Sequence, residues 1–493
     1  MTTLLACLAC AVTAAATPAE TKIQATDAAF GDRFGCSLAV SDGFALIGAQ
    51  ANDDDGGDSG CAYVLDLGGY VEVRKLRAAD AAGGDYFGCA VGLCGQRAVI
   101  GALRDDHSAT DTGAAYLFGA DDGIQHRKLT AADAAANDQF GCAVAVSDSF
   151  VLVGARYCDS SVTIYDSGAA YLFDPDTGVE LFKLIAADYG RQDQFGYAVA
   201  VSDSFAVIGA PMWDAVGRTD CGAVYVFDPR TGVEIWRLTA SDQGAYDRFG
   251  NAVALCGRTL LVGAYWGGGE DDAGAAYVFD VATGVELRKL TAADADYEDW
   301  FGSSVALSGE LAVIGASQQG YSTPRAGLSY VFNVATGAEL LRLAATGGNQ
   351  NDDFGVAVGI DGGCVVVGAD KDSDLALNAG AVYVYDPIAD PTGSGSASAP
   401  PAPFEVKANP NPFNPATEIE IALTSDCLVS ARVYDAGGKL RRVLLSGAPR
   451  PAGVMRLRWD GRDDAGRALP SGVYCCEVRT GTERSACKMV LTK

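Results

Sequence analysis

The sequence predicts an all-β protein, a seven-bladed β-propeller followed by a small β-sandwich. A Phe-Gly pair recurs seven times at intervals of 52 to 55 residues, and a fixed period near 50 indicates a repeat architecture. Each repeat contains four short apolar segments bounded by turn residues, which is the pattern of β-strands. The last 90 residues abandon this repeat and alternate apolar with polar residues over shorter segments.

The third repeat displays the unit clearly. Its four apolar segments are residues 140–146, 150–155, 168–173 and 179–184. Most are apolar on both faces, as expected for a sheet packed between two other sheets. Four antiparallel strands repeated around an axis make a propeller blade. Seven repeats therefore predict seven blades within residues 18–388.

The two ends of the repeat region complement each other. The last repeat stops after residues 380–387 and lacks a fourth apolar segment. The segment 21–27, which precedes the first repeat, matches the fourth-strand pattern of residues 128–133. We therefore predict that the N-terminal segment completes blade seven, which would also remove an exposed sheet edge.

The seven Phe-Gly pairs, each followed by a Val-Gly-Ala-like segment, resemble FG-GAP repeats. The pairs begin at Phe34, Phe87, Phe140, Phe195, Phe249, Phe301 and Phe354, and Gly209-Ala210-Pro211 gives the full ending. Such repeats form the integrin α-subunit head and parts of many bacterial surface proteins, so the resemblance implies adhesion or ligand binding. Integrin-like repeats often carry an Asp-rich calcium loop before the second strand. Here short turns such as residues 147–149 and 202–204 stand in its place, which resembles the calcium-poor bacterial type.

Two aspartate positions recur in the segments between repeats. One lies two residues before each Phe, at Asp32, Asp85, Asp138, Asp193, Asp247, Asp299 and Asp352. The other lies five residues earlier in six repeats, at Asp27, Asp80, Asp133, Asp188, Asp242 and Asp294. Recurrence in so many blades favours a structural role. We predict that both series cap backbone N–H groups in the loops between blades.

The cysteines do not form a regular disulfide framework. After the first 17 residues there are 13 of them, an odd number without regular spacing. Cys36, Cys89 and Cys142 share one repeat position, where the other repeats carry Tyr197, Asn251, Ser303 and Val356. A position that accepts such different residues is predicted to serve packing.

One acidic loop occurs in a single repeat and has the spacing of calcium ligands. Asp370, Asp372 and Asp374 supply oxygens at positions 1, 3 and 5, and Asn378 supplies one at position 9. Leu375 stands where the sharp turn favours Gly, and no acidic residue fills the later bidentate position. Calcium is thus the one cofactor that the sequence suggests, and a solvated acidic loop without metal is the alternative.

Charge and hydropathy exclude several partners. The net charge is −27, and residues 404–493 carry 14 Lys/Arg against 10 Asp/Glu, which leaves 22 against 53, or −31, for the rest. So acidic a surface repels phosphate backbones and anionic lipid, which excludes nucleic acid as a partner. Residues 4–12 are apolar and Ala14–Ala16 are small, so residues 1–17 are predicted to be a secretory signal peptide. No later apolar segment is long enough for a membrane span.

The C-terminal region has two parts. Residues 389–403 form a Gly/Ser/Pro-rich linker, and residues 404–493 are predicted to form the small β-sandwich. The latter resembles the immunoglobulin-like domain of flagellar hook-capping proteins and the related type IX sorting domains. The matching segments are residues 411–415, 459–463, 471–474 and 488–491. The resemblance implies sorting or anchoring through an export machinery, or a stalk.

A hairpin in this tail places two cysteines opposite each other. A two-residue loop at Gly481-Thr482 would pair Thr480 with Glu483, and counting outward sets Cys476 opposite Cys487. Directly opposed residues have Cβ atoms about 4.5–5.5 Å apart, which a disulfide could bridge with modest adjustment. Two packed thiols are the alternative.

Together these features predict an exported binding or adhesion module without catalytic activity, at the cell surface or secreted, with a protein or glycan ligand. The alternatives are a structural component of the cell envelope and a propeller polysaccharide lyase or hydrolase. An enzyme would need His, Tyr, Arg or acidic residues that converge at the axis, and we expect little such divergence among the repeats. The only histidines, His107 and His126, are predicted to be surface residues.

Overall fold

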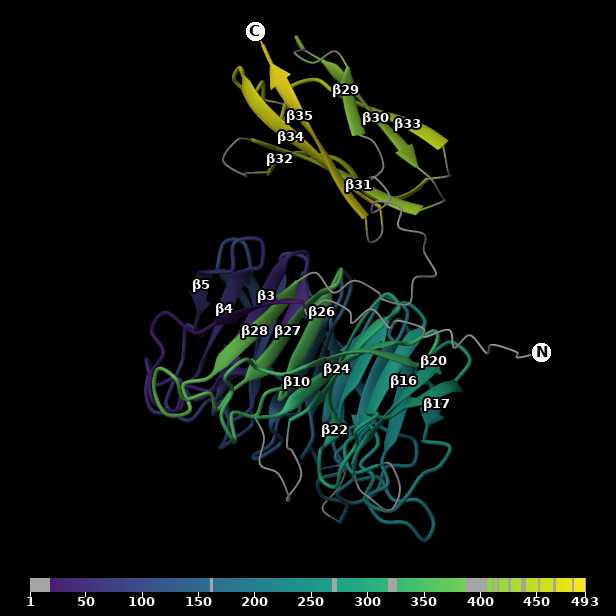
Figure 1. Cartoon of the computed structure of the whole chain (residues 1–493). Helices are drawn as coiled ribbons and strands as arrows, with labels where there is room; N and C mark the ends of the chain where they lie inside the picture. The colour runs from purple at the N-terminus through teal and green to yellow at the C-terminus, as the bar shows by residue number, and fades with distance from the viewer. Residues whose placement is uncertain are drawn as a thin grey trace, which may run out of the picture. The chain divides into compact units, whose positions relative to one another are not determined.

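The computed structural model describes two groups of residues. In the first are residues 18–159, 163–267, 273–317 and 326–386; in the second are residues 406–409, 411, 413–414, 416–423, 427–435, 440–450, 453–463, 467–480 and 483–492. The predicted signal peptide and linker lie outside these residues. The chain divides into two compact units, Met1–Pro391 and Thr392–Lys493. All elements of the described residues are β-strands, which confirms the all-β prediction (Figure 1). The described residues contain no helix that is long and apolar enough to cross a membrane.

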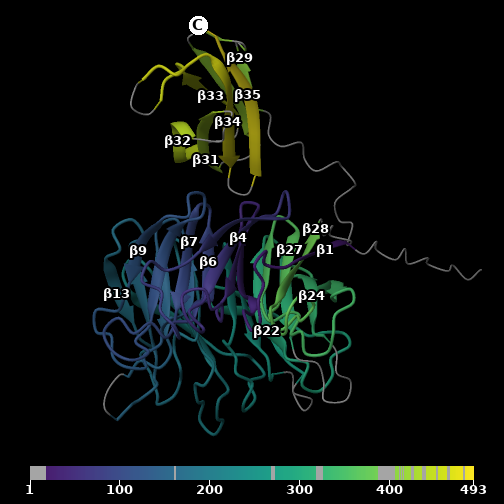
Figure 2. The same ribbon diagram turned by 90° about the vertical axis from the view of Figure 1, so that its left-hand side faces the viewer.

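The first unit consists of seven four-stranded antiparallel sheets, the predicted blades (Figures 1 and 2). The first strands are β2 (Phe34–Ser41), β6 (Phe87–Cys94), β10 (Phe140–Val146), β14 (Ala198–Val201), β18 (Val253–Cys256), β22 (Phe301–Ser308) and β26 (Val358–Asp361). The second strands are β3 (Phe44–Ala49), β7 (Arg97–Ala102), β11 (Val151–Ala155), β15 (Ala206–Ala210), β19 (Thr259–Ala264), β23 (Leu311–Ala316) and β27 (Cys364–Ala369). The third strands are β4 (Cys61–Asp66), β8 (Ala114–Gly119), β12 (Ala169–Phe173), β16 (Ala223–Asp228), β20 (Ala275–Asp280), β24 (Leu328–Asn333) and β28 (Ala381–Asp386). The fourth strands are β5 (Val71–Leu76), β9 (Gln125–Leu129), β13 (Glu180–Leu184), β17 (Val233–Leu238), β21 (Val285–Leu290), β25 (Ala338–Leu343) and β1 (Ala19–Ile23).

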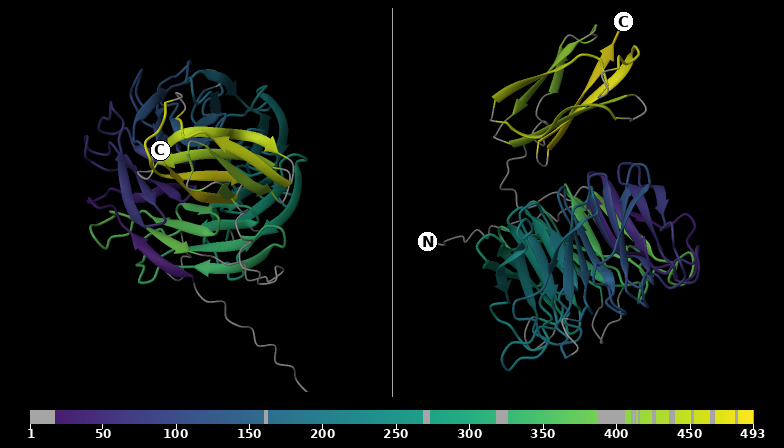
Figure 3. Two further views of the ribbon diagram at one scale, coloured as in Figure 1. Left: turned by 90° about the horizontal axis from the view of Figure 1, so that it is seen from above. Right: turned by 180° about the vertical axis from the view of Figure 1, so that it is seen from behind.

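The N-terminal strand closes the ring, as predicted. β1 pairs with β28 and completes the sheet β1-β28-β27-β26 of blade seven. Glu20 in β1 accepts the N–H of Thr346, as Glu72 in blade one accepts the N–H of Thr26. Each first strand contacts the first strand of the next blade, and β26 contacts β2. The first strands therefore surround the axis of the ring, around which the blades are arranged (Figure 3).

The Phe-Gly pair joins neighbouring blades. Phe34 is fully buried and packs edge-to-face on Tyr63, with ring centroids 5.2 Å apart, and the other six blades repeat this pair. Gly88 has φ of +90°, and a Cβ there would lie 2.3 Å from the carbonyl oxygen of Cys61 in the preceding blade. Glycine is therefore required both for the backbone conformation and for the close approach of blades.

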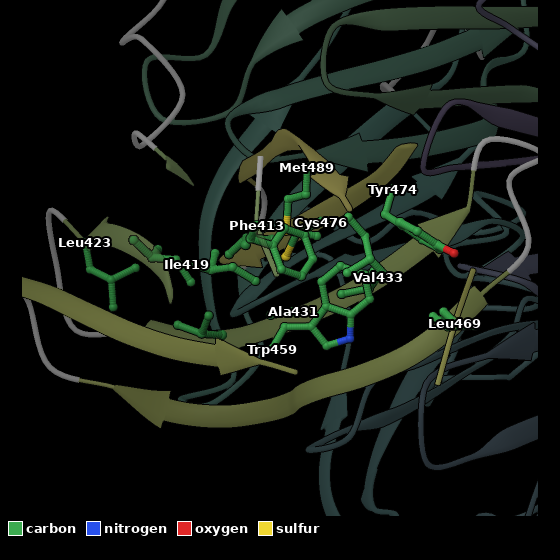
Figure 4. Close-up of a cluster of buried hydrophobic side chains, with 14 residues drawn as sticks. Phe413, Ile419, Leu423, Ala431, Val433, Trp459, Leu469, Tyr474, Cys476 and Met489 are labelled. Atoms are coloured by element: carbon green, nitrogen blue, oxygen red, sulfur yellow. The ribbon is translucent and has the colours of Figure 1, made fainter. Parts of the chain in front are cut away.

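The second unit is a β-sandwich. One sheet has the order β29 (Val406–Asn409), β30 (Thr417–Leu423), β33 (Gly453–Trp459), and the other has β32 (Leu440–Arg450), β31 (Cys427–Asp435), β34 (Gly472–Thr480), β35 (Glu483–Leu491). Trp459 is fully buried between the sheets and packs on Phe413 and Tyr474, with centroids 5.3 and 5.2 Å away (Figure 4). Its indole N–H donates to the carbonyl of Arg462 over 3.1 Å.

The C-terminal hairpin has the predicted register. Thr480 pairs with Glu483, and Cys476 lies directly opposite Cys487. Both residues are present as thiols, and a hydrogen bond between them lowers the pKa of Cys487. The geometry for a disulfide is thus in place, while the bond itself stays a prediction.

Candidate functional site

Each blade contains a hydrogen-bonded triad between its third and fourth strands. In blade one, Tyr63 Oη donates to Asp27 over 2.8 Å, and Lys75 Nζ donates to the same carboxylate over 2.6 Å. The ammonium lies 5.2 Å from the centroid of the Tyr63 ring, a cation–π distance. Burial acts to raise the pKa of Asp27, but the hydrogen bonds from Lys75 and Tyr63 outweigh it and hold that pKa below its ordinary value. The triad ties the loop before the blade to two strands of the blade.

Five other blades repeat this triad. Its members are Asp80, Tyr116 and Lys128; Asp133, Tyr171 and Lys183; Asp188, Tyr225 and Arg237; Asp242, Tyr277 and Lys289; and Asp294, Tyr330 and Arg342. The sequence prediction that this aspartate series caps backbone N–H groups is therefore incomplete, because its carboxylates bind side chains of the following blade.

The other aspartate series does cap the loops between blades. Asp32 accepts the N–H of Ala29 over 2.8 Å, and the other six aspartates likewise accept the N–H three residues earlier. Burial raises the pKa of Asp138 and Asp193 to about 6. This part of the prediction is confirmed.

Blade seven builds its triad with one of the predicted calcium ligands. Gly347 occupies the position of the inter-blade aspartate, and Lys22 of β1 pairs instead with Asp372 and Asp374, each at 2.6 Å. Tyr383 Oη also donates to Asp372 over 3.0 Å. The structure thus brings Asp372 and Asp374 together around an ammonium group.

The other two predicted ligands make different contacts. Asp370 is buried, and its carboxylate lies 4.0 Å from the guanidinium of Arg33; burial raises the pKa of Asp370 to about 6. Asn378 accepts the backbone N–H of Arg33 with its carbonyl oxygen. Across the described residues, no three His, Cys, Asp or Glu side chains are arranged to hold a metal ion. As arranged, the loop holds an ammonium, and calcium binding by these four residues stays a prediction.

The start of each first strand and the end of each second strand form what we call the inner rim of the ring. It comprises three positions in each blade: before Phe-Gly, after Phe-Gly, and after the Gly-Ala that ends the second strand. The position before Phe-Gly holds Arg33, Tyr86, Gln139, Gln194, Arg248, Trp300 and Asp353. The position after Gly-Ala holds Gln50, Leu103, Arg156, Pro211, Tyr265, Ser317 and Asp370. The side chains thus change from blade to blade, and the expectation of little divergence near the axis is wrong for the rim.

In blades one and two, the residue at the rim position after Phe-Gly joins adjacent blades. Cys36 Sγ donates to the carbonyl of Gly88 over 3.6 Å, and Cys89 Sγ donates to that of Gly141 over 3.5 Å. Burial raises the pKa of both thiols to about 12, so they are protonated and unreactive at neutral pH. The predicted packing role of these cysteines agrees with these contacts.

Arginine and aromatic side chains gather on the rim of blades three to six. We call this group the rim cluster, and its members are Arg156, Tyr197, Arg248, Asn251, Tyr265, Trp266 and Trp300. The guanidinium of Arg156 lies 5.5 Å from the centroid of Tyr197. That of Arg248 lies 5.0 Å from the centroid of Trp266, and its Nη1 donates to Tyr265 Oη over 3.0 Å. The rings of Tyr265 and Trp300 meet edge-to-face at 5.6 Å.

The two halves of the rim cluster are neighbours. Burial raises the pKa of Tyr265, and the nearby Tyr197 adds to that rise. Arg156 donates two hydrogen bonds to Gln139 Oε1. Among the described residues, neither Arg156 nor Arg248 has a carboxylate within 4.0 Å, although the ring is rich in acids.

Unfilled hydrogen-bonding groups concentrate in the rim cluster. Six buried side-chain polar atoms of the described residues lack a partner, and four of them belong here: Arg248 Nε, Asn251 Oδ1, Trp266 Nε1 and Trp300 Nε1. Asn251 is 92% buried, since its exposed fraction is 8%. An unfilled buried group costs about 1–3 kcal/mol. The cluster therefore carries hydrogen-bonding capacity that the fold does not use.

Sequence reasoning did not find the rim cluster. Its residues come from four blades separated by intervals of about 50 residues, and no local motif joins them. An alignment of the seven repeats contained the signal, because the rim positions differ from blade to blade while the Phe-Gly frame does not. His107 and His126, by contrast, are exposed as predicted.

Seven four-stranded blades around one axis, joined by Phe-Gly pairs and differing at the inner rim, define a repeat propeller. The chain belongs to the FG-GAP repeat family, which matches residues 18–65, 70–118, 124–173, 179–227, 233–279, 285–332 and 338–385. The FlgD Ig-like domain matches residues 411–483. Both resemblances predicted from sequence are thereby confirmed.

The search of curated proteins gave no match. One similar solved structure is that of PorZ, described as an essential bacterial surface component of the type-IX secretion system of Porphyromonas gingivalis. It is 13% identical with a TM-score of 0.47, and the match covers 96% of this chain and 61% of that one. The chain thus spans under two thirds of the length of PorZ.

Proposed function

We propose that this chain is an exported, non-catalytic binding module of the cell surface or the extracellular medium. In this proposal the rim cluster holds the ligand, and the C-terminal unit sorts or anchors the protein. Membership in the FG-GAP repeat family supports the surface location, since that family includes many bacterial surface proteins. The FlgD Ig-like match supports the role of the C-terminal unit.

One observation carries the binding role. The blades repeat their triads, caps and Phe-Gly contacts, yet the rim cluster departs from the repeat and holds four of the six unfilled buried groups found among the described residues. A ring with a purely structural role would have no use for such a cluster of unfilled groups, because donors and acceptors without partners only destabilise the fold. Ligand sites in proteins combine aromatic walls with a few polar groups in this way.

The non-catalytic part of the proposal rests on the chemistry of the rim. The cluster presents arginines, an amide and aromatic rings, and the nearby Cys36 and Cys89 thiols are protonated at neutral pH. Arginines, an amide and aromatic rings position and bind ligands, whereas a lyase or hydrolase also needs a general base and a general acid. Tyr197 and Tyr265 are the groups of the cluster nearest to these roles, but burial raises the pKa of Tyr265, so its phenol is protonated at neutral pH and is not a base. Turnover of a polysaccharide library that is lost in a rim variant would overturn this part.

The binding role is tested by a screen of glycan and peptide arrays and of whole cells with the purified protein. We expect at least one ligand whose binding is lost in the variant Arg248→Gln. The matched control is Arg33→Gln, which makes the same change at the same position of blade one and should bind like the wild type. Absence of any ligand, or equal binding by Arg248→Gln and the wild type, would reject the proposal.

A further inference from the structure

We propose that the rim cluster recognises a sugar acid, a polyhydroxylated ring that bears one carboxylate, such as a hexuronate unit of a glycan. This inference rests on the proposed function, because it names the ligand class of the same site. It follows from the chemical groups that the cluster leaves unfilled.

The two arginines select a carboxylate. Neither Arg156 nor Arg248 has an acidic partner within 4.0 Å among the described residues, while Arg33, Arg237 and Arg342 of the same ring do. The guanidinium groups lie 5.5 and 5.0 Å from the ring centroids of Tyr197 and Trp266, and hydrogen bonds from Arg156 to Gln139 and from Arg248 to Tyr265 restrict their rotation. A guanidinium held in one plane is prepared for a two-pronged hydrogen bond with a carboxylate.

The surroundings limit the charge of that ligand. Outside residues 404–493 the chain has a net charge of −31, and such a surface repels polyanions. A single carboxylate on an otherwise neutral molecule avoids most of this repulsion and can still pair with Arg248 or Arg156. The cluster therefore fits one acidic unit within a neutral or sparsely charged glycan.

The remaining unfilled groups select hydroxyls. Asn251 Oδ1 is an acceptor and needs a donor, whereas the indole N–H groups of Trp266 and Trp300 and Nε–H of Arg248 need acceptors. A hydroxyl group both donates and accepts, but a sulfate dianion only accepts. A polyhydroxylated carboxylate offers both the donors and the acceptors that these groups need.

The experiment uses the purified chain with the monosaccharides glucuronate and galacturonate, and with glucose, galactose and inorganic sulfate as comparisons. Binding is measured by calorimetry and by tryptophan fluorescence, since two of the five tryptophans lie in the cluster. We expect the wild type to bind a hexuronate and not the neutral sugars or sulfate. The variant Arg248→Gln should weaken that binding by about tenfold or more, because a charge-assisted pair is lost.

Two further variants keep the test independent of folding. Trp266→Phe retains an aromatic ring and removes one N–H, so it should weaken hexuronate binding with little change in melting temperature. Arg33→Gln should bind hexuronate like the wild type. Hexuronate binding that is equal in Arg248→Gln and the wild type would overturn the inference.

The outcome also separates this inference from the proposed function. If no hexuronate binds but an array ligand, such as a peptide with a terminal carboxylate, is lost in Arg248→Gln, the sugar-acid class is wrong and the binding role stands. If neither hexuronate nor array ligand binds, both proposals fail.

Discussion

The ion pair of Lys22 with Asp372 should stabilise the closed ring, and its removal gives a quantitative test of closure. Lys22 lies on β1 near the N-terminus, and its partner Asp372 belongs to blade seven, 350 residues away. The Asp372 side chain is 1% exposed and that of Lys22 is 24% exposed. In Lys22→Met the apolar stem is kept, while Asp372 loses the ammonium that compensates its buried charge.

The expected loss follows from the burial of this pair. Removing one partner of a buried pair costs about 3–5 kcal/mol, and the partial exposure of Lys22 reduces this to about 2–3 kcal/mol. For a unit of this size the unfolding entropy is roughly 0.8 kcal/mol per degree. The melting temperature should therefore fall by about 3–4 °C. Burial acts to lower the pKa of Lys22, but the hydrogen bonds that its ammonium donates to Asp372 and Asp374 raise that pKa above its ordinary value. The loss should therefore be constant from pH 6 to about 9.

The assay is calorimetric unfolding of the wild type, Lys22→Met, Asp372→Asn and the double variant. The double variant should lose less than the sum of the two single variants, because the interaction is shared. A matched control is Lys371→Met, whose partner Asp353 lies in the same blade and is more exposed. Additive losses, or an unchanged melting temperature in Lys22→Met, would refute the reasoning.

Four other predictions follow from the structure. Deletion of residues 18–28 removes β1 from blade seven and should cost several kcal/mol; an unchanged melting temperature would contradict closure. Asp138→Asn should stabilise the protein more at pH 8 than at pH 4. Burial raises the folded pKa of Asp138 to about 6, so the wild type loses stability as the pH rises from the ordinary aspartate value through that pKa, by at most about 3 kcal/mol; a pH-independent difference in unfolding free energy would contradict it. Calcium should raise the melting temperature of Lys22→Met more than that of the wild type, since the ammonium no longer occupies Asp372 and Asp374; no response in either protein would reject the calcium site. Peptide mapping of the unreduced secreted protein should find Cys476 bridged to Cys487, and a thiol at Cys487 would reject the bridge.

The sequence was sufficient for features that depend on local pattern or on counting. The Phe-Gly period predicted the blades, the missing fourth segment predicted the pairing of β1 with β28, and a two-residue turn predicted Cys476 opposite Cys487. Each of these follows from strand periodicity and from the rule that buried sheet edges need a partner. No knowledge of side-chain direction between blades was needed.

Features that depend on contacts between blades could not be predicted in the same way. Asp27 and Asp32 both recur at fixed spacing, yet Asp27 binds Tyr63 and Lys75 of the following blade whereas Asp32 caps its own loop. Spacing within a repeat does not reveal which carboxylate faces the next sheet. The same limit applies to Lys22. Its pairing with Asp372 replaces the pairing with the inter-blade aspartate, which blade seven lacks because Gly347 stands at that position, and it depends on contacts that form only in the closed ring.

The location of the rim cluster has a physical reason in the architecture itself. Where blades pack face to face, every blade must carry the same Phe, Gly and Tyr residues, because a change at one interface leaves a cavity or a clash. At the rim the first strands of all blades approach one axis, and the side chains before Phe-Gly are half-buried rather than enclosed. Residues such as Arg248 and Trp300 can therefore vary without disturbing the packing between blades, and side chains of several blades can meet there. In a ring of equivalent repeats, the inner rim is therefore the place where different residues can form a binding site with the least loss of stability.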